Sequence, residues 1–296
     1  MFNAKRASAN SVINRVLSNA NGVGTSKSQA RNNSGLKGQN GHKISDKAHS
    51  IKELQNLRTV TTQYVNFVKE NYQGKVASNI NAESARAFIA SKAQTVASST
   101  LNTYISTMNK VVDNLAKDNI GSLQRNDIKD IKQDFNTSKN HENRAYENVE
   151  SIKEAMRDTT MSISSDLQAE AGLRADDAIN SSKWTINNDN TITINGSKGG
   201  IEYTTRALSD ETIQRAREAQ ENGYKANYTE YREALREAVI STNQDYNGTH
   251  GLRYNFAQER VEELKNNGYS EDEAKAQTSL EMGHSRIDIT NHYTSF

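Results

Sequence analysis

Six residues in the second half of the chain have side chains suited to chemistry on a phosphodiester bond. They are two arginines, a lysine, two histidines and a tyrosine: Arg174, Lys198, His250, Arg253, His284 and Tyr293. A tyrosine hydroxyl can act as a nucleophile and form a phosphotyrosine linkage that stores the energy of the broken bond. Arginine forks suit the negative charge that builds up on phosphoryl oxygens, and histidine and lysine can transfer protons. Together, side chains of these types could bind a phosphate group, attack it and transfer protons without a metal ion.

Each of these residues also has an ordinary structural explanation. Arg174 is followed three residues later by Asp177 on the same helix face, which is typical of an ion pair. A lysine in a hairpin turn, such as Lys198 in NGSKGG, is usually solvated. A histidine at the start of a helix is often a cap, and a tyrosine near the end of a chain often packs on the surface. The functional interpretation therefore depends on the whole set and on its order along the chain.

The spacing of the last two residues sets a condition on the backbone. His284 and Tyr293 are nine residues apart. At about 100° per residue, an unbroken helix would place them on opposite faces. Both can meet one phosphate only if the helix breaks near residues 283–285, where a glycine and a serine suit such a break.

The elements that would position these residues are mainly helical, with one exception. Residues 185–187, 191–195 and 201–205 alternate polar and apolar side chains and are separated by Asn- and Gly-rich turns. This pattern predicts a β-hairpin or a small three-stranded sheet, with Lys198 in a turn. Helical periodicity covers the rest of residues 148–296.

An earlier region, residues 50–136, predicts a small all-helical domain. Apolar residues recur there at spacings of three and four, as one helix face requires. Further helices are predicted to begin at caps Asn81 and Ser98 or Ser99, and a shorter one around residues 122–135. The polar segment 137–147 is predicted to be a linker to the second domain.

Charge is distributed unevenly along a chain whose total is nearly neutral. Residues 1–50 carry eight Lys and Arg side chains and one acid, whereas residues 151–296 carry 16 basic and 24 acidic groups. We expect residues 1–49 to form a mostly disordered basic tail or arm, with a short helix near residues 10–17. The tail is either a solvated extension without a partner or an arm that touches DNA.

Composition excludes several classes of protein. The chain has no cysteine, which rules out disulfide scaffolds, Cys-ligated zinc, iron–sulfur clusters and cysteine nucleophiles. Its longest apolar run is four residues, against the ~20 that a membrane-spanning helix needs. No secretory signal is evident, so we expect a cytoplasmic, nucleoid-associated protein. No cofactor is expected, and no histidines show metal-ligand spacing that would indicate a metal site.

Four stretches together resemble the tyrosine recombinase/integrase family. AGLRADDAI resembles its first-arginine box, NGSKGG its catalytic-lysine hairpin, HGLRYNFA its His-x-x-Arg box, and MGHSRIDITNHY its Gly-His box followed by the nucleophilic tyrosine. The resemblance covers about residues 150–296. The helical region is similar, more weakly, to the family's core-binding domain. The implied fold is an N-terminal helical core-binding (SAM-like) domain followed by an α+β catalytic domain at 148–296.

The resemblance also implies roles and partners. Tyr293 would be the nucleophile, and Arg174, Arg253 and His284 would bind the phosphate, with Asp177 supporting Arg174. The resemblance implies that Lys198 donates a proton to the leaving 5′ oxygen and that His250 acts as the base for Tyr293 or as a proton shuttle. The activity would be metal- and ATP-independent site-specific recombination through a 3′-phosphotyrosyl intermediate, in the integration or excision of a mobile element. The partners would be duplex DNA, a tetramer formed on two DNA sites, and an accessory DNA-bending protein.

Two other functions fit the same residues. A type IB topoisomerase-like enzyme would relax DNA without pairing two sites, and an inactive relative would bind DNA without cutting it. The chain also departs from the family pattern. Tyr254 stands where the family often has a second histidine, Ala207 stands where proline is common, and three residues follow Tyr293. How subunits would contact one another at this end is therefore left open.

Overall fold

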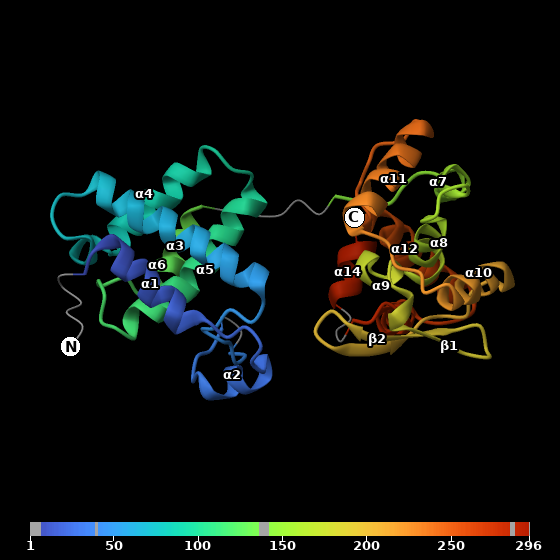
Figure 1. The fold of residues 1–296 in the computed structure, drawn as a ribbon, viewed down its shortest axis with the longest axis horizontal. Coiled ribbons are helices and arrows are strands. Elements are labelled where there is room, and N and C mark those ends of the chain that lie inside the picture. The colour runs from blue at the N-terminus through green and yellow to red at the C-terminus, as the bar shows by residue number, and fades with distance from the viewer. Residues whose placement is uncertain (1–6, 39–40, 136–141, 285–287, 296) are drawn as a thin grey trace. The chain divides into compact units, whose positions relative to one another are not determined.

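The computed structural model of the chain describes residues 7–38, 41–135, 142–284 and 288–295. The chain divides into two compact units, Met1–Asn140 and His141–Phe296, which we call unit 1 and unit 2. Figure 1 shows helices joined by loops in unit 1, and helices together with a small sheet in unit 2. This confirms the predicted fold class. Among the described residues, no helix is long and apolar enough to cross a membrane.

Unit 1 is built from helices, and most of the connections between them are short. They are α1 (Ala9–Ala20), α2 (Lys27–Asn33), α3 (Ile51–Asn71), the 3₁₀ turn Val76–Asn79, α4 (Ala82–Ala93), α5 (Ser98–Ala116) and α6 (Arg125–Asp134). The predicted cap at Asn81 is confirmed, because Asn81 and Ser84 bond to each other's backbone N–H groups. The prediction of a cap at Ser98 or Ser99 is wrong: α5 already begins at Ser98, and Ala97 precedes it without a side-chain cap.

The N-terminal segment belongs to the core of unit 1, so the prediction of a disordered tail is wrong for its described part. Helix α1 packs against α3 and α5, and Val12 and Val16 are fully buried. The spacing of its apolar residues makes one buried stripe, which the Ser- and Asn-rich composition conceals. The loop after α2 is also held in place. There Asp46 pairs with Lys117, and Asn114 donates a hydrogen bond to the Asp46 carbonyl at 2.9 Å.

Unit 2 has more elements, and most of its helices are shorter. Its helices are α7 (Val149–Met156), α8 (Ser162–Ala171), α9 (Ala175–Ala178), the 3₁₀ turn Ser181–Lys183, α10 (Asp210–Glu221), α11 (Tyr228–Ser241), α12 (His250–Asn266), α13 (Glu271–Glu281) and α14 (Asp288–Thr294). Its strands are β1 (Trp184–Ile186), β2 (Ile192–Ser197) and β3 (Ile201–Thr204).

The three strands form the predicted antiparallel sheet in the order β1–β2–β3. On β2, Ile194 pairs with Trp184 on one side and with Tyr203 on the other. The register then shifts between Ile194 and Ser197, and Gly196 within the shift has a φ of 63°. Such a bulge adds one residue to the strand. Consequently Ser197 is buried like Ile194, whereas Gly196 is exposed.

Helix α12 occupies the middle of unit 2, where it packs against α8, α13 and α14 (Figure 1). Its first turns also anchor the segment that enters unit 2. The backbone N–H of Tyr146 donates to Asn255 Oδ1, and Asn255 Nδ2 donates to the Tyr146 carbonyl, each at 2.8 Å. The Tyr146 ring lies directly against Gly251, where a Cβ would come within 2.4 Å of it. The entering segment is therefore fixed to the turns of α12 that flank Arg253.

Candidate active site

Arg174 is placed by a tight turn between two helices. It precedes α9 in an extended conformation, just after Gly172 ends α8 with a left-handed φ of 60°. Its Nη1 donates to Ser197 Oγ at 3.1 Å, and its Nη2 donates to the Gly283 carbonyl at 3.0 Å. Burial and the positive charge of Arg253 lower the pKa of Arg174. Segments more than 100 residues apart therefore meet at this guanidinium.

Asp177 supports this arrangement indirectly, and not through the ion pair with Arg174 that helix spacing suggests. Its side chain is 1% exposed and accepts hydrogen bonds from Lys183 Nζ at 2.8 Å and Ser197 Oγ at 2.5 Å. Lys183 is thus the ion-pair partner of Asp177. The link from Asp177 to Arg174 passes through the hydroxyl of Ser197, because Arg174 precedes α9 in an extended conformation and does not share a helix face with Asp177.

Arg253 is buried, with 1% of its surface exposed. It donates hydrogen bonds to the carbonyls of Gly172 and Met282, and its Nη2 lies 2.9 Å from His284 Nε2. Among the residues that the structure describes, neither Arg253 nor Arg174 has a carboxylate within ion-pair distance. Two guanidinium groups therefore converge on one turn of the chain without a negative partner.

That turn is the break that the spacing of His284 and Tyr293 requires. Helix α13 ends at Glu281, Gly283 has a left-handed φ of 66°, and α14 begins at Asp288. A side chain on Gly283 would also collide with the ring of Tyr203, 2.5 Å from the position of its Cβ. The predicted break is therefore confirmed at Gly283; Ser285 lies outside the described residues.

The break brings the tyrosine back over the arginine and the histidine. The rings of His284 and Tyr293 stack with centroids 5.7 Å apart and an angle of 16°. The guanidinium carbon of Arg253 lies 5.8 Å from the centre of the Tyr293 ring. Tyr293 is 6% exposed. Four of the six residues singled out in the sequence thus form one cluster: Arg174, Arg253, His284 and Tyr293.

The other two are exposed to solvent. Lys198 lies in the turn between β2 and β3, and His250 is the first residue of α12. Neither side chain forms a hydrogen bond or ion pair with another described residue. The positive charge of Lys198 nevertheless helps to lower the pKa of His250. Both side chains are free to act on a bound molecule.

Both histidines are neutral at physiological pH. Burial and the charge of Arg253 lower the pKa of His284 to about 3. Desolvation and the charge of Arg253 lower the pKa of His250 to about 4, although its side chain is partly exposed. Because Arg253 donates to Nε2 of His284, the neutral ring carries its proton on Nδ1. That Nδ1 is buried and has no hydrogen-bond partner in the described part of the chain.

The fold is similar to those of three solved DNA complexes. The XerH site-specific recombinase bound to a palindromic difH substrate is 14% identical, with a TM-score of 0.62 over 96% of this chain and 90% of that one. A lambda integrase dimer bound to a COC′ core site is 12% identical, with a TM-score of 0.61 over 82% and 88%. The Tn1549 transposon integrase in complex with circular intermediate DNA is 13% identical, with a TM-score of 0.59 over 96% and 95%. This chain has the tyrosine recombinase fold. No protein-family model and no curated protein matches its sequence.

One position at the cluster departs from the tyrosine recombinase sequence pattern. Tyr254 follows Arg253 on α12, is 2% exposed, and packs against Tyr293 with ring centroids 4.8 Å apart. Its hydroxyl lies 2.9 Å from Nε2 of His292, the residue before Tyr293. Tyr254 therefore braces α14 from α12. In the sequence, the position of Tyr254 next to Arg253 marks it as part of the motif. Its contacts with His292 and Tyr293 are not evident there.

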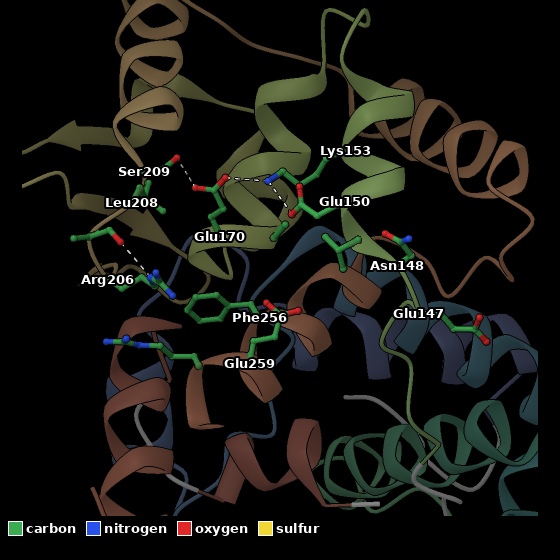
Figure 2. Close-up of a pocket in the computed structure, with 14 residues that line it drawn as sticks. Glu147, Asn148, Glu150, Lys153, Glu170, Arg206, Leu208, Ser209, Phe256 and Glu259 are labelled. Carbon is green, nitrogen blue, oxygen red and sulfur yellow. Dashed lines mark hydrogen bonds and ion pairs between the residues drawn. The ribbon is translucent and has the colours of Figure 1, made fainter. Parts of the chain in front are cut away.

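A cavity of about 630 Å³ lies in unit 2, apart from the cluster of candidate residues (Figure 2). Its polar side chains largely satisfy one another: Lys153 pairs with Glu150 and Glu170, and Ser209 donates to Glu170. Phe256 of α12 forms part of its wall. None of the six candidate residues lines it. Among the described residues, moreover, no three His, Asp or Glu side chains are close enough together to bind a metal ion.

Proposed function

We propose that this protein is a site-specific DNA recombinase that cleaves and rejoins DNA strands through a 3′-phosphotyrosyl intermediate. The observation that carries the proposal is the meeting of two arginines, a neutral histidine and a tyrosine at one turn of unit 2. The similarity in fold to three DNA-bound recombinases and integrases supports it.

The charge of the cluster fits a phosphate. Arg174 and Arg253 have no carboxylate partner among the described residues, so an anion would neutralise them favourably in this partly buried setting. Two buried donors, Arg253 Nε and His284 Nδ1, also have no hydrogen-bond partner in the described part of the chain. Oxygens of the scissile phosphate would satisfy such donors. Charge-assisted bonds of this kind would stabilise the transition state, where the negative charge on those oxygens is greatest.

The proton transfers are assigned to the exposed pair. The Tyr293 oxygen attacks phosphorus, the new oxygen–phosphorus bond forms, and the bond to the 5′ oxygen breaks. His250 accepts the tyrosine proton, because its neutral imidazole has an acceptor nitrogen. Lys198 donates a proton to the leaving 5′ oxygen from the β2–β3 turn. Rejoining is the reverse sequence, so the reaction needs no external energy source.

Unit 1 offers a surface for the DNA backbone. A groove of about 740 Å³ lies between α5, α6 and the loop that follows α2, and no Asp or Glu is among its lining residues. We call it the basic groove, after the side chains that line it: Lys37, His42, Lys110, Arg125, Lys129 and Lys132. Such a surface binds phosphates without reading sequence. We assign residues 50–136 to a core-binding domain, extended by α1, with 137–147 as linker and 148–296 as catalytic domain.

The assembly and biological role are proposed from the same similarity. A lambda integrase tetramer has been solved on a Holliday junction, and the Tn1549 integrase belongs to a transposon. We propose that this protein forms a tetramer on two DNA sites, acts in the integration or excision of a mobile element, and works at the nucleoid. An accessory DNA-bending protein is a further partner to test.

Covalent capture tests the proposed reaction. The protein would be incubated with DNA from the regions flanking its own gene, nicked so that the cleaved end diffuses away. We expect an SDS-resistant protein–DNA adduct that Tyr293→Phe abolishes and that Tyr269→Phe, which alters an exposed tyrosine, retains. Sequencing the trapped DNA would give the site. Specific binding without an adduct would indicate an inactive DNA-binding protein, and relaxation of plasmid without recombinant product would indicate a topoisomerase-like enzyme.

A further inference from the structure

Ser197 is buried between Arg174 of the candidate site and Asp177. Its hydroxyl is within hydrogen-bond distance of Arg174 Nη1, at 3.1 Å, and of Asp177 Oδ2, at 2.5 Å. Ser197 is 3% exposed, so water does not compete for these bonds. A hydroxyl has one hydrogen, and an ionised carboxylate can only accept. The Ser197 hydroxyl must therefore donate to Asp177 and accept from Arg174.

The carboxylate at the other end of this chain of bonds is itself fixed. Lys183 Nζ binds the second oxygen of Asp177 at 2.8 Å. The orientation of the Asp177 carboxylate is thus set on one side by Lys183 and on the other by Ser197. Because hydrogen bonds to a carboxylate are stronger than those between neutral groups, this orientation is passed on to the Arg174 guanidinium.

The backbone around Ser197 is arranged for this contact. The bulge at Gly196 turns Ser197 to the buried face of β2, where a regular strand would have placed residue 196. Lys198 follows directly, at the start of an exposed turn. The last buried side chain before the exposed lysine is therefore the one that touches Arg174.

We propose that Ser197 is a positioning residue that couples the β2–β3 turn carrying Lys198 to Arg174, with Asp177 as the anchor. The phosphate-binding arginine and the proton-donating lysine are then placed as one unit. The proposal rests on the proposed recombinase function for its catalytic consequence, whereas the mechanical coupling does not depend on it.

The coupling is tested first without any reaction. Amide hydrogen exchange of the turn at residues 198–200 would be measured in the full chain and in four variants. Ser197→Ala and Asp177→Asn should both speed exchange there, although Asp177 lies 20 residues away in sequence. Ser197→Thr, which keeps the hydroxyl, should restore slow exchange. Thr204→Val is the matched control, because it removes an exposed hydroxyl of the same sheet and should leave the turn unchanged. Unchanged exchange in Asp177→Asn would overturn the coupling.

The catalytic consequence is tested by single-turnover cleavage on saturating suicide DNA. Ser197→Ala should slow adduct formation about 10–100-fold, the usual effect of losing one hydrogen bond to a charged group, with DNA affinity unchanged. On DNA with sulfur in place of the 5′ oxygen, which leaves without a proton, the loss should be several-fold smaller. Adding Ser197→Ala to Asp177→Asn should cause little further loss.

The possible failures can be told apart. Altered exchange with no wild-type adduct would refute the recombinase function and leave the coupling in place. A wild-type adduct with an unchanged rate in Ser197→Ala would overturn the positioning role. An equal loss on the oxygen and sulfur substrates would also overturn it, because Ser197 would then act on Arg174 alone.

Discussion

The two units carry opposite charges and use their cations differently. Residues 1–140 contain 20 Lys and Arg and nine Asp and Glu, whereas residues 141–296 contain 17 and 27. Among the described residues of unit 1 a single apolar cluster forms the core, and lysines line a surface groove. In the described part of unit 2 the apolar core is divided into four clusters, and Arg253 is buried with its neighbour Arg174 half-buried.

Positive charge therefore has a different role in each unit. Surface lysines attract phosphates at long range, and salt weakens that attraction. Buried arginines are held rigidly where water is excluded, and there each hydrogen bond to a transition state is worth more. An acidic unit can thus act on DNA when its few functional cations are inside, and a basic unit can supply the general affinity.

The largest expected effect comes from changing the buried arginine without removing its charge. Arg253→Lys loses the planar fork that reaches two carbonyls and His284, so we expect the single-turnover rate of adduct formation to fall about 100–1000-fold. Arg260→Lys is the matched control on the same helix, because Arg260 pairs with Glu281 outside the cluster. Its rate should stay within about threefold of the wild type. Equal rates for Arg253→Lys and wild type would show that the buried arginine acts only through its charge, as a surface lysine of unit 1 would.

A medium effect is expected on the pH dependence of stability. The pKa of His284 is about 3 in the folded chain and about 6.5 when unfolded, so between these values the unfolded state binds a proton that the folded state does not. Stability is therefore full above pH 6.5 and falls as the pH drops. From pH 7 to pH 5 the free energy of unfolding of unit 2 should fall by about 2 kcal/mol more in wild type than in His284→Gln.

Urea unfolding at the two pH values, followed by the fluorescence of Trp184 in unit 2, would measure this. Between pH 7 and pH 8 the two proteins should change alike. Identical pH dependence below pH 7 would show that the histidine is not desolvated beside Arg253.

The smallest effect is expected in the basic groove of unit 1. Replacing Lys129 and Lys132 by alanine should flatten the dependence of log Kd on log salt by up to ~0.9 for each DNA phosphate that the groove then leaves unneutralised. Adduct formation on saturating DNA should not change. Lys69→Ala with Lys75→Ala removes two exposed lysines of the same unit outside the groove and serves as control. An unchanged slope in the groove variant would place the DNA on another face.

Local sequence patterns predicted much of this fold. Helical periodicity and alternation gave the helices and the sheet, and the spacing of His284 and Tyr293 required the break that Gly283 provides. The short helix predicted near residues 10–17 is present as α1, but the prediction of a disordered tail around it is wrong, because average composition did not show that this helix packs into the core. The ordinary explanation of Arg174 as the ion-pair partner of Asp177 does not apply, because Arg174 precedes α9 in an extended conformation.

The contacts that the sequence did not predict join residues that are far apart in the chain. Ser197 reaches Arg174 through a bulge that depends on pairing between strands, and Tyr254 meets a residue 38 positions later. Neither contact leaves a local signal in the sequence. The types and order of the six candidate residues predict a common site, but they do not predict that Lys198 and His250 are exposed whereas the other four form a cluster.

The anchoring of Tyr146 on α12 has a mechanical consequence. Tension that reaches unit 2 along the chain from unit 1 is carried by the contacts of residues 143–146, which bond Gln258 and Asn255 of α12 and Asn247 just before it. The load falls on the helix that begins with His250, and bypasses the sheet. A pull on the first unit would therefore act on the helix that carries Arg253.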